Sequence, residues 1–480
     1  MPITTNQPRS GQVTARRPGS WGALLGVAAL PLLVACGASD PSRPNVVIID
    51  IDSLRADRLS AQRDGEPIAP TLAALAGQGV VFEHHIAQGG WTMPSLASLL
   101  SGRYPVALRE QTSKLSWLPG GASVLPQILG DRGYHTAFYA GSTLVYSATV
   151  GGMFQDVIAP PERDDERLVT PMAQWVEHEA REPFFALLHD MDLHSADHRL
   201  PASAVCRWAA DAERCAELAD QQLPVVYDTL APLVGPELAQ AQVIAQYDGT
   251  LAAYDQALGA LFAALERRGV RERTIVVLSS DHGEELGEHG FYGHGVLYDT
   301  VLRIPLVVAD PWRDPGGRVA TVTQTVDIAP TLLDRLGLPG AGSMDGRSLL
   351  PLMDGRAAEE GQRPVFSLSD RFIASVRTAD SKLWMTSCPP HKHCRELDAA
   401  LPAGDRARVV QYFRLDVDPG EREDLAMREA QATVVALGQL DAWLGTRVQE
   451  ASDAGYDQLP PDPVLLERLR QDGYWTHVSE

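Results

Sequence analysis

Short apolar runs alternate with amphipathic stretches along most of the chain. Residues 45–51 form a largely apolar run that ends in acidic residues, which is the pattern of a parallel strand buried on both faces. Further strands are predicted at 135–139, 184–189, 274–279 and 305–308. Strands that alternate with helices are typical of an α/β fold.

The clearest helical signal lies between the predicted strands at 184–189 and 274–279. Apolar residues recur there at intervals of three and four from Tyr247 to Leu265, and Gly269 follows as a stop signal. A second, shorter helix is predicted at 331–336. The alternation of strands and helices therefore continues through this part of the chain.

Breaks in the alternation suggest the domain organisation. Residues 195–240 interrupt it, and we expect a lid-like insertion near the active site. The main domain is predicted at 44–355, because a polar, glycine-containing stretch follows it. A smaller domain is expected at 364–445, and the proline-containing residues 446–480 are expected to form a weakly packed tail.

The N-terminus has the features of a targeting segment. Three arginines lie among the first 17 residues, and residues 21–34 form an apolar run that is short for a transmembrane helix. The run ends in Leu-Val-Ala-Cys, which resembles a bacterial lipoprotein box. We therefore expect residues 1–35 to be a lipoprotein signal peptide. A plain signal peptide and an uncleaved anchor are the alternatives.

Lipidation would place an acyl chain on Cys36, with residues 36–43 as a linker. The expected location is then the periplasmic side of a bacterial membrane, with the lipid bilayer as a partner. Gly37 follows the cysteine in place of the aspartate that acts as an inner-membrane retention signal. The outer membrane is therefore favoured over the inner one.

The composition is that of a folded, acidic protein. Hydrophobic residues make up 45% of the chain, and charged residues 21%. The formal net charge of −21 would repel phosphate backbones, so nucleic acid is not an expected partner. A solvated acidic surface accounts for the charge.

Four cysteines besides Cys36 form two local pairs. Disulfides at Cys206–Cys215 and Cys388–Cys394 are the simplest interpretation in an oxidising compartment. The alternative for the second pair is a metal site of two cysteines and two histidines. Its ligands would be Cys388, His391, His393 and Cys394.

Aspartate and histidine residues cluster directly after three predicted strands. Asp50 and Asp52 belong to the first cluster, the segment 187–194 contains the second, and Asp281 and His282 begin the third. Ligands of open α/β sheets bind at the carboxyl ends of the strands. One carboxylate there could simply cap a helix, but three clusters favour a metal site.

The most informative motif lies at 90–105 and reads Gly-Trp-Thr-Met-Pro-Ser-Leu-Ala-Ser-Leu-Leu-Ser-Gly-Arg-Tyr-Pro. It resembles the active-site signature of the sulfatase family, Cys/Ser-x-Pro-Ser-Arg-x-Ser-Leu-Leu-Thr-Gly. The most specific further match is Asp-His-Gly-Glu followed by Gly-Glu-His-Gly within 281–290. Together with the other landmarks, the resemblance covers roughly residues 44–425. These landmarks lie at 326–333, 345–350 and 413–425.

The resemblance implies both a fold and a cation site. The fold would be alkaline phosphatase-like, with a large, mixed, mostly parallel sheet flanked by helices and a smaller C-terminal α+β subdomain. Asp52, Thr92, Asp281 and His282 match family positions around one divalent cation, and Asp50 is a further candidate ligand. Because an imidazole ligand disfavours calcium, zinc or manganese is expected, with calcium and magnesium as the alternatives.

The resemblance also implies which side chains face the substrate. His194 and His294 match basic residues near the leaving group, where histidine can donate a proton. Hydrogen-bonded structural roles are the alternative for both, and for His289 a structural role is favoured. Lys114 is a candidate substrate-binding residue, although a solvated surface position is the favoured interpretation.

The chain departs from the family pattern at the nucleophile and around it. Thr92 occupies the slot of the cysteine or serine that becomes formylglycine, and Leu96 replaces the following arginine. Ser53 stands where many members have a second aspartate. Ser142 and Leu144 stand where the family has a lysine and a histidine. The formylglycine apparatus and its supporting cations are thus missing together.

These departures suggest a different nucleophile. Metal coordination can activate the Thr92 hydroxyl. Water can release a phosphoryl group from a threonine ester, whereas a threonine lacks the second hydroxyl with which formylglycine expels sulfate. We therefore expect a metal-dependent hydrolase of sulfuric or phosphoric esters that favours phosphoryl groups on a small molecule, glycan or lipid. Phospho-group transfer to a lipid or glycan, and a catalytically silent anion-binding lipoprotein, are the alternatives.

Overall fold

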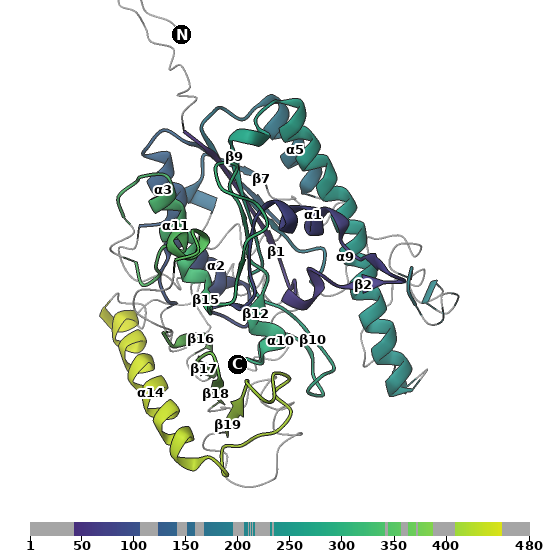
Figure 1. Ribbon diagram of the computed structural model, residues 1–480, viewed down its shortest axis with the longest axis vertical. Helices are drawn as coiled ribbons and strands as arrows, with labels where there is room; N and C mark the ends of the chain where they lie inside the picture. Colours follow the sequence, from purple (N-terminus) through teal and green to yellow (C-terminus); the bar gives the residue numbers. More distant parts are fainter. Residues whose placement is uncertain are drawn as a thin grey trace, which may run out of the picture. The chain divides into compact units, whose positions relative to one another are not determined.

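We describe the protein from a computed structural model (Figure 1). The chain divides into two compact units, Met1–Ala38 and Ser39–Glu480, and all described residues belong to the second. They are residues 43–105, 123–141, 151–158, 168–194, 206–209, 211, 213, 215–216, 231–232, 235–340, 344–356, 363–370, 373–386 and 409–453. Within these ranges, every helix is too short or too polar to cross a bilayer.

An eight-stranded mixed sheet forms the centre of the larger unit, in the order β14-β4-β13-β9-β1-β8-β6-β7. Strand β13 runs antiparallel to its neighbours β4 and β9, while the remaining pairs are parallel. This confirms the expected large, mixed, mostly parallel sheet. The strands are β14 (Arg318–Val319), β4 (Val80–Phe82), β13 (Val307–Ala309), β9 (Thr274–Ser279), β1 (Asn45–Ile51), β8 (Phe184–Asp190), β6 (His135–Ala140) and β7 (Asp156–Ile158).

Strand β1 lies inside the sheet and is buried along its whole length. Its side chains alternate between two hydrophobic cores, as the period of a strand requires. Val46 and Ile48 belong to the core that includes α2, whereas Val47 and Ile49 belong to the core that includes α9. Full burial of each such side chain contributes about 2 kcal/mol, which explains why the run is continuously apolar.

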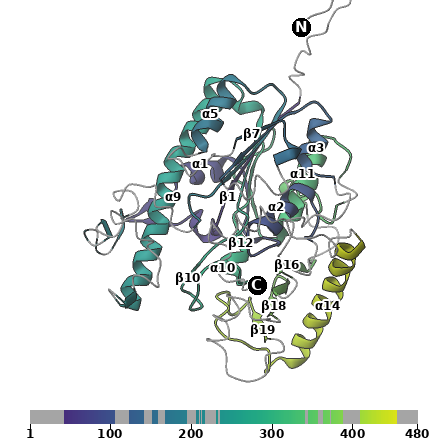
Figure 2. The same cartoon turned by 180° about the vertical axis from the view of Figure 1, so that it is seen from behind.

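Helices cover both faces of the sheet (Figures 1 and 2). One face carries α1 (Pro70–Gln78), α5 (Val169–His178) and the long α9 (Pro236–Arg267). The other carries α2 (Thr92–Ser101), α3 (Leu125–Gly130) and α11 (Ile328–Arg335). Both helices expected from the sequence are present, and α9 extends further toward the N-terminus than the predicted segment.

A second, four-stranded antiparallel sheet follows, in the order β16-β17-β18-β19, and α14 (Ala430–Asp453) contacts it. This is the expected C-terminal α+β subdomain. Helix α14 runs through residue 445, where we predicted the tail to begin. The strands are β16 (Val365–Asp370), β17 (Ile373–Arg377), β18 (Ser381–Thr386) and β19 (Val409–Arg414).

Short elements connect these layers. The strands are β2 (Gln62–Arg63), β3 (Glu66–Pro67), β5 (His85–Ile86), β10 (Glu285–Leu286), β11 (Tyr292–Gly293), β12 (Arg303–Ile304) and β15 (Thr323–Gln324). The short helices are η1 (Ala56–Arg58), η3 (Gly151–Met153), η4 (Arg271–Arg273), α10 (Asp299–Leu302), η5 (Thr325–Asp327) and α12 (Leu350–Met353).

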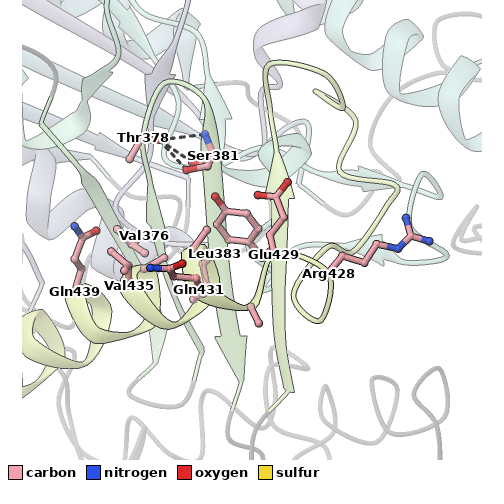
Figure 3. Close-up of a pocket in the computed structure, with 13 residues that line it drawn as sticks. Val376, Thr378, Ser381, Leu383, Arg428, Glu429, Gln431, Val435 and Gln439 are labelled. Atoms are coloured by element: carbon pink, nitrogen blue, oxygen red, sulfur yellow. Dashed lines mark hydrogen bonds between the residues drawn. The ribbon is translucent and has the colours of Figure 1, made fainter.

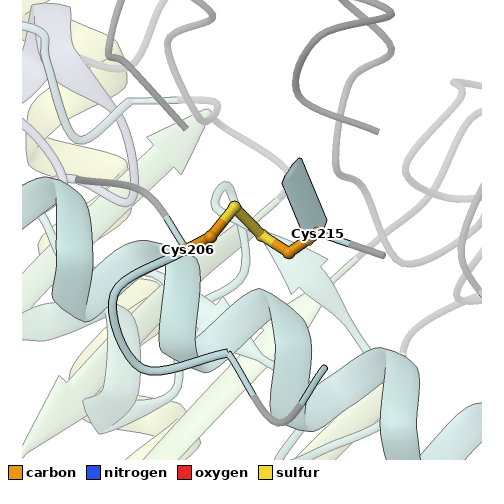
Figure 4. Close-up of a disulfide and its surroundings, with 2 residues drawn as sticks. All are labelled: Cys206 and Cys215. Carbon is orange, nitrogen blue, oxygen red and sulfur yellow. A yellow bond between two sulfur atoms is a disulfide. The ribbon is translucent and has the colours of Figure 1, made fainter. Parts of the chain in front are cut away.

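A disulfide joins Cys206 and Cys215, the first of the two expected pairs (Figure 4). Both cysteines are buried. Most of the interval 195–240, predicted as an insertion, lies outside the described residues, as do Cys36, Lys114, Cys388 and Cys394. Their proposed roles stay predictions.

Candidate active site

The candidate site lies at the carboxyl ends of three neighbouring central strands. Strands β8, β1 and β9 run parallel, and their ends meet at one edge of the sheet. Asp52 follows β1, and Asp281 and His282 follow β9. The topology therefore brings together residues that are more than two hundred positions apart in sequence, at the edge where such sheets bind ligands.

The four predicted ligands Asp52, Thr92, Asp281 and His282 lie close together. His282 Nε2 lies 3.6 Å from Asp52 Oδ1 and 3.4 Å from Asp281 Oδ2. The Thr92 hydroxyl donates to Asp52 Oδ2 at 3.3 Å. Asp52, Asp281 and His282 are each at most 1% exposed, and Thr92 is 7% exposed.

Thr92 is the first residue of α2, so it stands at the positive end of that helix. The preceding Gly90 lets the backbone pass close to its neighbours: a Cβ there would come within 2.8 Å of Ser369 Oγ and of Val296 O. Trp91 Nε1 donates to Ser369 O at 2.7 Å. The start of α2 is thus fixed against the C-terminal subdomain.

Leu96, four residues after Thr92, is fully buried in the hydrophobic core next to the sheet. It occupies the position at which the sulfatase signature has arginine. An aliphatic side chain at this position packs against its neighbours and offers no charge to a substrate.

The buried polar atoms fit a divalent cation. Asp281 Oδ2 and His282 Nε2 have no hydrogen-bond partner among the described residues, although burial makes an unpaired polar atom costly. His282 Nδ1 lies 2.9 Å from Gly283 O, and a proton on Nδ1 would leave Nε2 available to bind a cation. Two carboxylates, an imidazole and a hydroxyl make up a suitable donor set.

Ser53 takes part in this arrangement without matching the aspartate of the family pattern. Its hydroxyl donates to Asp52 Oδ1 at 2.8 Å, and its backbone N–H donates to Asp281 Oδ1 at 3.3 Å. The residue adopts a φ of 63°, which turns the backbone amide toward Asp281. Ser53 therefore orients both carboxylates.

The sequence interpretation included His189 in the second cluster without assigning it a role, and the structure places it beside the predicted ligands. His189 Nδ1 lies 2.8 Å from Asp50 Oδ2, and His189 Nε2 lies 3.7 Å from Asp52 Oδ2. Asp50 thus contacts this histidine, although we expected it to be a candidate ligand. The feature that places His189 in the site is the register of β1 against β8, in which Asp50 is opposite His189. A single sequence does not reveal that register.

A second group of side chains lies beside His282. The ring centroids of His282 and His294 are 4.4 Å apart, and those of His194 and His294 are 4.9 Å apart. Glu284 Oε2 lies 3.6 Å from His294 Nδ1. Glu284 likewise had no assigned role in the sequence interpretation. Donor atoms of His282, Glu284 and His294 all lie within 4.8 Å of one another, so this group could also hold a cation.

The electrostatic surroundings of His194 and His294, the two histidines predicted to face the substrate, differ. Burial disfavours the charged forms of His294 and Glu284, but their pairing raises the pKa of His294 and lowers the pKa of Glu284. Burial lowers the pKa of His194. Burial also opposes ionisation of Asp52, whose pKa the surrounding imidazoles nevertheless hold below its usual range.

Arg55 holds two site loops together. Its Nε and Nη2 donate to Asp57 at 3.0 Å each, and its Nη1 donates to Glu288 Oε1 at 2.6 Å and to Glu284 O at 3.1 Å. The backbone N–H of Arg55 donates to Tyr247 Oη at 3.1 Å. The loop after β1 is therefore tied to the segment that carries Glu284.

His289 has the structural role expected from the sequence. Its Nδ1 lies 2.9 Å from Glu285 Oε1, its Nε2 lies 2.9 Å from Gly420 O, and its ring stacks on Tyr298. Ser142 and Leu144 lie outside the described residues.

A groove of about 630 Å³ lies elsewhere, between the C-terminal sheet and α14 (Figure 3). Val376, Leu383, Tyr412 and Val435 are among its lining residues. It contains none of the predicted site residues, so it is not the candidate active site.

Comparisons with known proteins identify the family of the chain. The family model described as Sulfatase matches residues 44–338. The ulvan-active sulfatase of Formosa agariphila is 26% identical over 343 residues, which cover 65% of this chain and 66% of that protein. The multifunctional alkaline phosphatase superfamily protein PehA of Trinickia caryophylli is 32% identical over 205 residues, which cover 40% of this chain and 38% of that protein. Both alignments thus span less than two thirds of the relative's length.

A solved structure supports the fold. The phosphonate monoester hydrolase of Agrobacterium radiobacter superimposes with a TM-score of 0.56 at 21% identity. The match covers 85% of this chain and 96% of that one.

Proposed function

The chain belongs to the sulfatase family, and from this premise we propose that it hydrolyses sulfuric or phosphoric esters with a divalent cation and with Thr92 as the nucleophile. We further propose that phosphoryl esters are the favoured substrates. A small molecule, a glycan or a lipid could carry the ester. The observation that carries the proposal is the position of the Thr92 hydroxyl, 3.3 Å from Asp52 Oδ2 at the N-terminus of α2.

Asp52, Asp281, His282 and Thr92 would hold the cation. When bound, a divalent cation lowers the pKa of a hydroxyl that it contacts and balances negative charge on the group under attack. Zinc and manganese suit the mixture of carboxylate and imidazole donors, with calcium or magnesium as the alternatives. Ser53 keeps both carboxylates in position.

The chemistry of threonine supports the preference for phosphoryl groups. Attack forms a bond between Thr92 Oγ1 and phosphorus and breaks the bond between phosphorus and the leaving alcohol. Water then attacks the phosphothreonine, which releases phosphate and restores the Thr92 hydroxyl. A sulfated threonine lacks the second hydroxyl with which formylglycine expels sulfate.

His194 and His294 would serve the leaving group. Their rings are 4.9 Å apart next to His282, close enough to the reacting centre to bind the ester oxygens. One of them donates a proton to the departing alcohol, as histidine does in general acid catalysis. Lys114 stays a candidate for substrate binding from a loop.

We also propose that the protein is anchored at the periplasmic side of a bacterial membrane through an acylated Cys36. The lipoprotein-box sequence before this cysteine supports the proposal. A Cys36→Ala variant should lose incorporation of a labelled fatty acid and leave the membrane fraction. Unchanged labelling would contradict the proposal.

A substrate panel tests the catalytic proposal. Wild type, Thr92→Ala and Thr92→Ser are assayed with an aryl sulfate, a phosphate monoester, a phosphate diester and a phosphonate monoester, each with zinc and with manganese. We expect phosphoryl turnover to exceed sulfate turnover, and Thr92→Ala to lower it about 1000-fold. Thr92→Ser should keep part of the activity. Acid quenching and peptide mass spectrometry should find a phosphoryl group on Thr92.

The controls separate the alternatives. Ser98→Ala changes a buried residue of the same helix and should leave turnover unchanged. Full activity in Thr92→Ala would remove Thr92 from the mechanism, and faster turnover of sulfate would refute the phosphoryl preference. A phosphorylated acceptor alcohol would indicate a transferase. Failure to turn over any ester would favour the anion-binding lipoprotein.

A further inference from the structure

His189 is a buried histidine that the proposed reaction leaves without a role. It lies near the end of β8, its side chain is 0% exposed, and its Nε2 has no hydrogen-bond partner among the described residues. Its other nitrogen, Nδ1, lies 2.8 Å from Asp50 Oδ2. A neutral imidazole with its proton on Nδ1 satisfies this contact and leaves the Nε2 lone pair available.

The Nε2 atom of His189 faces the predicted cation ligands. His189 Nε2 lies 3.7 Å from Asp52 Oδ2, and the donor atoms of Asp52, His189 and Asp281 all lie within 4.8 Å of one another. A distance of 3.7 Å is too long for a hydrogen bond. Three possible donor atoms thus converge in a buried space, where a bound cation would satisfy all of them.

We propose that His189 is an additional ligand of the cation, that Asp50 orients it, and that two imidazoles thereby make the site selective for a transition metal such as zinc over calcium or magnesium. This inference rests on the proposed function for the presence of the cation. It goes further by assigning His189 as a ligand, a role that the sequence interpretation did not give it, and by narrowing the choice of metal.

Asp50 has the geometry of an orienting residue. It lies near the end of β1, two positions before Asp52, which follows the strand. Asp50 contacts Nδ1 of the histidine, while Asp52 faces its Nε2. A carboxylate that accepts the second N–H of a ligating histidine fixes the tautomer and raises the basicity of the ligand, and its loss weakens metal binding about 10- to 100-fold.

Metal binding to the purified chain tests the proposal without relying on catalysis. The protein is stripped with a chelator, and cobalt is titrated in while its visible absorption is recorded; zinc and calcium affinities come from competition. Wild type should bind zinc far more tightly than calcium. His189→Asn, which keeps an N–H toward Asp50 but lacks the Nε2 donor, should bind zinc at least about 100-fold more weakly, with an altered cobalt spectrum.

Two further variants sharpen the result. His189→Gln places an amide oxygen near the position of Nε2, so it should narrow the preference for zinc over calcium while keeping part of the affinity. Asp50→Ala should weaken zinc binding more than Asp50→Asn, whose amide oxygen can still accept the Nδ1 proton. His85→Asn is the matched control, because His85 is equally buried but contacts Thr323 away from the site.

Unchanged zinc affinity and an unchanged cobalt spectrum in His189→Asn would overturn the proposal, provided that circular dichroism shows a folded protein. Equal weakening in His85→Asn would also overturn it, since the effect would then be general. The titration can also reveal a second bound cation per chain. If that cation still binds to His189→Asn but is lost in Glu284→Gln, it belongs to the group of His282, Glu284 and His294. The assignment of His189 to the first cation then stands. If wild type binds zinc through His189 but hydrolyses no ester, the proposed function fails and the ligand assignment stands.

Discussion

The Ser53 hydroxyl donates a hydrogen bond to Asp52 Oδ1 at 2.8 Å, and both side chains are fully buried. The same residue binds Asp281 through its backbone N–H. A serine that replaces a carboxylate of the family pattern thus acts on two ligands through hydrogen bonds, and contributes no charge of its own.

Removing that hydroxyl should weaken cation binding. We expect Ser53→Ala to lower zinc affinity about tenfold, because Asp52 loses the group that orients it. Calorimetric titration of the metal-free protein measures the effect, with Ser98→Ala as the control for a buried serine outside the site. Ser53→Gly, which tolerates the φ of 63°, separates the two contributions. If Ser53→Gly binds like wild type, backbone conformation is responsible for the effect.

Arg55→Lys should reduce turnover, because a lysine cannot make the paired hydrogen bonds to Asp57 and still reach Glu288. We also expect a loss of about 2 kcal/mol of unfolding free energy, measured by urea denaturation. Arg58→Lys is the matched control in the same loop, where the side chain pairs with Asp248. Equal losses of turnover in both variants would show that Arg55 has no particular influence on the segment that carries Glu284.

Lys382 should be important for stability. It is 1% exposed, and its ammonium lies 2.8 Å from both Asp299 and Glu421. Lys382→Met leaves the buried Glu421 and the partly buried Asp299 without this partner, so we expect a loss of about 3–5 kcal/mol in urea unfolding. Adding Glu421→Gln should restore part of that loss. A double variant that is no more stable than the single one would show that charge imbalance is not the cause.

His85 predicts how stability depends on pH. Burial lowers its pKa to about 3, so between that value and the unfolded-state value the unfolded chain binds more protons than the native protein. The stability of the native protein is therefore not reduced by His85 above the unfolded-state pKa. It falls as the pH drops from that value toward about 3, because the unfolded chain takes up a proton that the buried ring does not. From pH 7 to pH 5 we expect a loss of about 2 kcal/mol from this residue.

Denaturant unfolding at the two pH values measures that loss in wild type and in His85→Gln. The variant removes the titrating ring, so its stability should fall less over the same interval. Parallel losses in the two proteins would assign the acid sensitivity to other groups.

Local patterns were sufficient to predict much of the architecture. The apolar run at β1 predicted a strand buried on both faces, since two cores meet there. Asp52, Asp281 and His282 could be predicted as neighbours because the ends of parallel strands share one edge. These inferences depend on short sequence segments and on a general rule of α/β sheets.

The remaining features depend on long-range geometry. His189 becomes part of the site through the register of β8 against β1, and Glu284 through its approach to His294. A lone sequence contains neither relationship. The orienting role of Ser53 likewise depends on a left-handed backbone conformation that serine seldom adopts.

The contacts of Trp91 and His289 have a consequence for how the protein can be divided. Trp91, directly before the proposed nucleophile, binds the carbonyl of Ser369, and His289 binds that of Gly420. The matched family region ends at residue 338, so both partners lie beyond it. A fragment cut at that boundary would keep every proposed ligand and the nucleophile, yet it would lose two of the supports that hold them. We therefore expect turnover to require the C-terminal subdomain as well as the matched family region.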